Sequence, residues 1–67
     1  MTEEALAMDR AHTAAQAAGL QILMIDDSTG VWVAQAGLPN QEPVHEAQNE
    51  TRAGALNALA LLIETEA

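Results

Sequence analysis

Few side chains in this 67-residue chain titrate near neutral pH or act as nucleophiles. The histidines are His12 and His45, Ser28 is the only serine, and the sequence contains no Cys, Lys or Tyr. Ser28, His45 and Asp27 have the composition of a hydrolytic triad, in which a base activates a hydroxyl nucleophile. No glycine-framed turn of the nucleophile-elbow type surrounds Ser28, and nothing in the spacing orients the three groups. We therefore expect no enzymatic activity.

Two groups of histidine and acidic residues suggest a metal site: Asp9 with His12, and His45 with Glu42 and Glu46. Neither group supplies the closed tetrahedral ligand set of a structural zinc site. The acidic stretch 26–30 lacks the alternating ligand positions and the terminal glutamate of a calcium loop. The four glycines are scattered and form no phosphate-binding motif. We expect neither a metal ion nor another cofactor.

The charge balance is the most informative feature of the composition. Ten acidic residues against two arginines give a formal net charge of −8. Such a surface attracts positively charged partners and disfavours direct contact with DNA, RNA or an anionic membrane, because Lys and Arg bind those polyanions. The alternative explanation is plain solvation, since net charge keeps small proteins dispersed.

The segments that position these acids alternate between helical and strand patterns. Apolar residues recur at helical spacing from Ala7 to Ala18, with Thr2 as a plausible N-cap and Gly19 placed to end the helix. Residues 20–26 have a period of two, with apolar residues on both faces, and a turn at 26–30 leads to a second strand over 31–36. A short third strand is expected over 43–48, where Pro43 confines it to a sheet edge.

A second helix is expected from a cap at Asn49 or Thr51 to about Glu64, with a buried stripe of Ala55, Ala58, Leu59 and Leu62 and with Leu56 and Ile63 beside it. The order predicts a single α+β domain over 1–67, a two-layer sandwich of the form α-β-β-(β)-α with both helices on one face of an antiparallel sheet. Fifteen residues are alanine, so the core must depend on close approach of backbones. The larger residues expected to supply most of the burial are Leu20, Ile22, Leu23, Ile25, Val31, Val33, Leu56, Leu59, Leu62 and Ile63.

This topology gathers acids from separate segments. If three strands form, six carboxylates are expected at one end of the molecule: Glu3, Glu4, Asp26, Asp27, Glu46 and Glu50. With two strands, Glu64 and Glu66 would take the place of the last two. Trp32, the only aromatic residue, is expected in or beside the core; if it faces away from the helices it becomes the best apolar anchor for a partner.

Two families share part of this pattern. The element order is similar to that of double-stranded RNA-binding domains, but the lysine cluster that opens their second helix is replaced here by residues 49–54, with Arg52 alone, so RNA binding is not expected. The strand 31–33, the loop 37–39 and the opening of the second helix at Glu50 and Thr51 resemble HicB-like antitoxin domains. That resemblance implies a small module that masks a partner protein.

In overall profile, a very small, alanine-rich, acidic chain without cysteine, the sequence resembles the anti-CRISPR proteins carried by phages. This resemblance implies a non-enzymatic inhibitor that mimics DNA and covers a basic DNA-binding site of a CRISPR effector complex. The alternative is an antitoxin-like or phage accessory module that binds its partner through apolar surface around Trp32. We expect a monomer or homodimer in the bacterial cytoplasm, because no leader or membrane-spanning run is visible and cysteine is absent.

Overall fold

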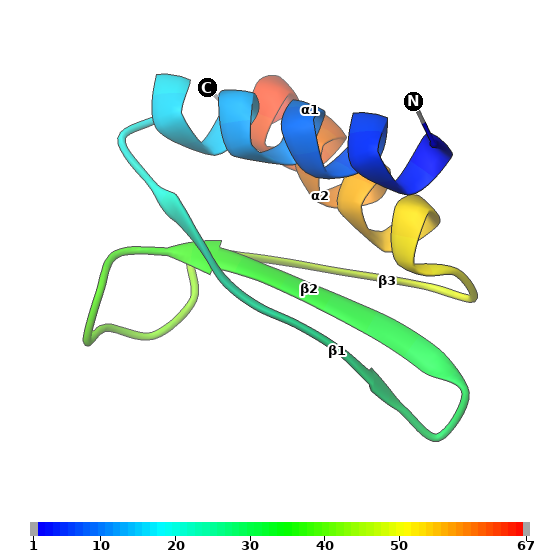
Figure 1. The fold of residues 1–67 in the computed structure, drawn as a ribbon. Coiled ribbons are helices and arrows are strands. Elements are labelled where there is room, and N and C mark those ends of the chain that lie inside the picture. The colour runs from blue at the N-terminus through cyan, green and yellow to red at the C-terminus, as the bar shows by residue number, and fades with distance from the viewer. Residues whose placement is uncertain (1, 67) are drawn as a thin grey trace.

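The chain folds into two helices and three strands, described by a computed structural model over residues 2–66 apart from the side chain of Ser28. In chain order the elements are α1 (Glu3–Ala17), β1 (Gln21–Ser28), β2 (Val31–Gly37), β3 (His45–Asn49) and α2 (Arg52–Glu66). The strands form one antiparallel sheet in the order β1-β2-β3, and both helices lie on the same face of it (Figure 1). The predicted α+β architecture is confirmed, including the third strand, which occupies 45–49 rather than 43–48.

Side-chain caps fix the start of both helices. The hydroxyl of Thr2 accepts a hydrogen bond of 3.1 Å from the backbone N–H of Ala5, as expected of an N-cap. At α2 the hydroxyl of Thr51 accepts a 3.0 Å hydrogen bond from the N–H of Gly54, which makes Thr51 the cap. The side chain of Asn49 supports this turn by accepting the N–H of Thr51 at 3.4 Å.

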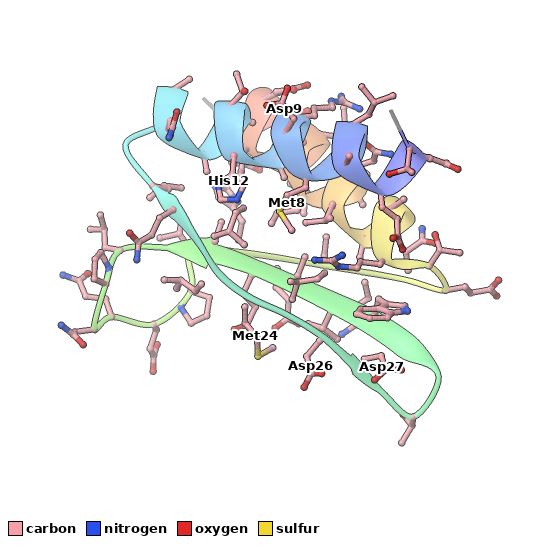
Figure 2. The ribbon with its side chains drawn as sticks, in the orientation of Figure 1. Met8, Asp9, His12, Met24, Asp26 and Asp27 are labelled. Atoms are coloured by element: carbon pink, nitrogen blue, oxygen red, sulfur yellow. The ribbon has the colours of Figure 1, made fainter. Side chains whose placement is uncertain are left out.

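A β-bulge in β1 changes which side chains face the helices. The register with β2 shifts between Ile22 and Met24, so Leu23 is the extra residue. Ile22 and Ile25 both pack against the core, whereas Met24 points away from the helices (Figure 2). The period of two expected over residues 20–26 would place Ile22 and Met24 on one face; that expectation is wrong, because the inserted residue inverts the pattern beyond it.

Alanine dominates the interior. Of the thirteen buried hydrophobic residues in the described chain, ten are alanine and the others are Leu56, Leu59 and Ile63. The buried positions of α1 are all alanine: Ala7, Ala11, Ala14 and Ala15. Small side chains let the helices approach each other and the sheet closely, as the composition predicted.

Some residues expected in the core lie outside it. Leu62 is 38% exposed, because the buried stripe of α2 follows the spacing of Leu56, Leu59 and Ile63 and the helical rotation turns Leu62 away from it. Val31 and Val33 are only partly buried and alternate with Ala34, which is fully buried. They therefore belong to the sheet face that no helix covers.

Candidate functional site

The acidic side chains are almost entirely without cationic partners. All ten Asp and Glu residues are exposed. Within residues 2–66 one ion pair forms, between Nη2 of Arg10 and Oε1 of Glu64 at 3.0 Å. This pair joins α1 to α2, and its hydrogen bond and charge raise the pKa of Arg10. Nine carboxylates are left to interact with solvent or with a partner.

Three segments lie along one side of the molecule, on the right of Figure 1: the start of α1 at the top, the start of α2 below it and the turn between β1 and β2 at the bottom. We call this surface the acidic end and define it by five carboxylates, those of Glu3, Glu4, Asp26, Asp27 and Glu50. The nearby cation is Arg52, the first residue of α2, so five negative charges against one leave a formal charge of −4.

Local structure orders part of this end. Glu3 and Glu4 occupy the first turn of α1, where the helix dipole favours negative charge. The backbone N–H of Asp27 donates to Oδ1 of Asp26 at 2.9 Å, next to the turn at Thr29 and Gly30. The hydrogen bond orients the carboxylate of Asp26, and the helix dipole stabilises the charges of Glu3 and Glu4; neither interaction neutralises these acids.

Glu46 does not lie at the acidic end, contrary to the expectation. It is the second residue of β3, which runs toward that end, and it stands opposite Gln35, two register positions farther from that end than Asp26, which stands opposite Val33. Its carboxylate accepts hydrogen bonds from Nε2 of Gln35 at 2.8 Å and from Nε2 of Gln48 at 3.4 Å. These contacts fix Glu46 on the sheet face opposite the helices.

The other four acids lie elsewhere on the surface. Asp9 projects from α1 away from the sheet (Figure 2), Glu42 is in the β2–β3 loop, and Glu64 and Glu66 are in the last turn of α2. Negative charge therefore covers much of the molecule, with half of the acids at one end.

Trp32 lies on the helix-covered side of the sheet. It is partly buried and packs against the core, and it stands opposite Asp27 on β1 and Asn49 on β3. Because it does not face away from the helices, the condition that would make it an anchor on the uncovered face is not met.

The uncovered side of the sheet forms a second surface, which we call the open face. Its members are Leu23, Met24, Asp26, Val31, Val33, Gln35, Glu46 and Gln48. The bulge places two consecutive apolar residues there: Met24 is 39% exposed, and a Cβ at Gly37, on the same face, would lie 3.1 Å from Cδ1 of Leu23. The apolar residues on both faces of the first strand signalled this surface in the sequence, but its members could not be chosen without the bulge.

The residues that suggested catalysis or metal binding are separated. Asp27 and His45 stand four register positions apart on the two outer strands, about 13 Å along the sheet and about 10 Å across it. The side chain of Ser28 is outside the described residues.

The two groups that suggested a metal site are also separated. His45 and Glu46 point to opposite faces because they are neighbours in a strand. Figure 2 shows His12 directed toward the sheet but Asp9 away from it. No group of three metal-ligating side chains and no pocket occurs in the part of the chain described.

Neither helix is long and apolar enough to cross a membrane, within the residues that the structure covers. Comparisons of the chain with protein-family models, with curated proteins and with solved structures found no match. The surface chemistry therefore carries the functional argument.

Proposed function

We propose that this protein is a non-enzymatic inhibitor whose acidic surface covers a basic nucleic-acid-binding site on another protein. The observation that carries the proposal is the exposure of all ten carboxylates, with a single ion pair among the described residues. Unpaired surface charge of one sign steers a partner of the opposite sign. The acidic end, which carries carboxylates from three segments, is the part of the surface that we assign to this contact.

Size and charge support mimicry of a short DNA duplex. The molecule extends over 27 × 26 × 18 Å. A DNA duplex 27 Å long carries about 16 phosphate charges, roughly half of them on each strand. The formal net charge of −8 is close to that of one such strand.

Within this class, the finer proposal is an anti-CRISPR protein that blocks target-DNA binding by a CRISPR effector complex. Its support is the resemblance in size, composition and acidity described above. Such effectors hold DNA in positively charged channels, which an acidic globule of this size complements.

The test is a charge reversal with a matched control. Asp26→Lys with Asp27→Lys changes the net charge by +4 at the acidic end, and Asp9→Lys with Glu66→Lys makes the same change outside it. Inhibition of target-DNA binding is measured by fluorescence anisotropy on purified CRISPR effector complexes, after circular dichroism confirms that both variants are folded. We expect the first variant to lose at least about tenfold in potency and the second to lose much less, because close charge pairs contribute most to binding.

Equal losses in the two variants would show that total charge alone matters and would remove the acidic end as the site. Failure of the unmodified protein to inhibit any effector would overturn the finer proposal. The broader proposal, that the protein covers a basic nucleic-acid-binding site, is then tested by measuring whether it competes with nucleic acid for binding to other basic nucleic-acid-binding proteins.

The alternative of an antitoxin-like or phage accessory module that binds through Trp32 has less support. Trp32 is partly buried beneath the helices, so a partner would reach only part of its ring. Trp32→Phe distinguishes the two functions, because it keeps an apolar ring against the core. Under the proposed function this change leaves inhibition unaltered.

A further inference from the structure

The open face combines apolar and acidic side chains in an ordered arrangement. Val31 and Val33 lie on the central strand, β2, while Asp26 and Glu46 lie on the outer strands, β1 and β3. Asp26 stands directly opposite Val33, and Glu46 stands opposite Gln35. Val31 and Val33 at the centre, with Leu23 and Met24 beside them on β1, thus have one carboxylate on each outer strand, and no basic residue is among the residues that define this face.

We propose that the open face binds an amphipathic helix of a partner protein, with apolar side chains over β2 and Lys or Arg on either flank. The inference rests on the proposed function only in taking the partner to be basic. It adds that recognition is partly apolar and occurs on a surface that shares only Asp26 with the acidic end.

The dimensions suit a single helix. The outer strands of a three-stranded sheet lie about 10 Å apart, which is the diameter of one helix. The seven residues of β2 extend over about 23 Å, the length of a helix of about 15 residues. The helices α1 and α2, each 15 residues long, already pack on the opposite face of the same sheet.

Charge complementarity selects this occupant over a second copy of the chain. Two copies would bring net charges of −8 together and would place Asp26 and Glu46 of each against an acidic surface. A basic helix instead pairs both carboxylates. Glu46 is already held by Gln35 and Gln48, so little side-chain freedom is lost when it binds a cation.

Two synthetic helical peptides of about 15 residues test the proposal. One carries Leu at helical spacing with Lys on both flanks, and the other has the same lysines with Gln in place of Leu. Binding to the full chain is measured by isothermal titration calorimetry and mapped by amide chemical shifts. We expect the Leu peptide to bind at least about tenfold more tightly, with the largest shifts in residues 23–26, 31–35 and 46–48.

Near-isosteric variants locate the contact. Met24→Gln with Val33→Thr removes apolar surface from the open face, and Leu6→Gln with Leu61→Gln removes it from exposed helix positions, which are 55% and 57% exposed. The first pair should weaken the Leu peptide about tenfold and leave the Gln peptide unchanged, whereas the second pair should change neither. If Val33→Thr unfolds the chain, Met24→Gln alone and the shift map of the unmodified protein carry the test.

Equal affinity for the two peptides, or shifts confined to the helices or to the members of the acidic end other than Asp26, would overturn the proposal. A dimer in sedimentation equilibrium that Met24→Gln with Val33→Thr dissociates would also overturn it, because a second copy would then occupy the face. The charge-reversal assay is read separately. Loss of inhibition on reversal together with equal peptide affinities would reject the open face alone, and absence of inhibition with normal peptide binding would reject the inhibitory function alone.

Discussion

Gly54 is the residue on which the start of α2 depends. A Cβ at this position would lie closer than 3.0 Å to Oδ1 of Asn49 and to Oγ1 of Thr51, the two side chains that order this turn. Gly54→Ala must displace the cap, which costs about 1–2 kcal/mol. The gain in helix propensity is at most about 1 kcal/mol. We predict a net loss of about 1 kcal/mol in the free energy of unfolding, measured by urea denaturation.

The sign of this effect shows whether displacement of the cap or the gain in helix propensity dominates. Thr51→Ala removes the cap oxygen without adding a clash, so Gly54→Ala in that background should cost less than in the unmodified chain. Stabilisation by Gly54→Ala in the unmodified chain would contradict the assigned cap.

The helices and strands could be predicted from the sequence, but which side chains of the strands lie on which face of the sheet could not. Periodicity, the cap at Thr2 and the turn residues after Asp26 located both helices and the hairpin. The bulge at Leu23 is not visible in a run in which every residue is apolar, because apolar residues on both faces fit either register. The same ambiguity affected Glu46, whose position along the sheet depends on where β3 begins.

The buried stripe of α2 yields a prediction at the scale of the element. Leu59 is fully buried, whereas Leu61, two residues later, is 57% exposed. Leu59→Ala should lower the free energy of unfolding by about 3 kcal/mol and Leu61→Ala by less than about 1 kcal/mol. Chemical denaturation of both variants, at equal ionic strength, measures the difference. Similar losses in the two variants would mean that the helix is rotated relative to this structure.

For the whole molecule, the nine carboxylates that form no ion pair within residues 2–66 repel one another in the folded state more than in the expanded chain. Salt screens this repulsion, with a Debye length of about 30 Å at 0.01 M and about 10 Å at 0.1 M. The thermal unfolding midpoint should therefore rise as sodium chloride increases from 0.01 to 0.2 M, by calorimetry. A midpoint that falls with salt would indicate that ion pairs, such as that of Arg10 with Glu64, outweigh the repulsion.

The measurement that tests the central claim most directly is the association rate constant with the inhibited effector complex, followed by stopped-flow fluorescence as ionic strength rises. A dye attached to the effector provides the signal, because the only aromatic residue of the chain, Trp32, is partly buried against the core and does not lie in the proposed contact. If the acidic surface drives the encounter, the rate constant should fall by at least about tenfold between 0.01 and 0.2 M salt while the dissociation rate changes little. An association rate constant that is independent of salt would contradict the account.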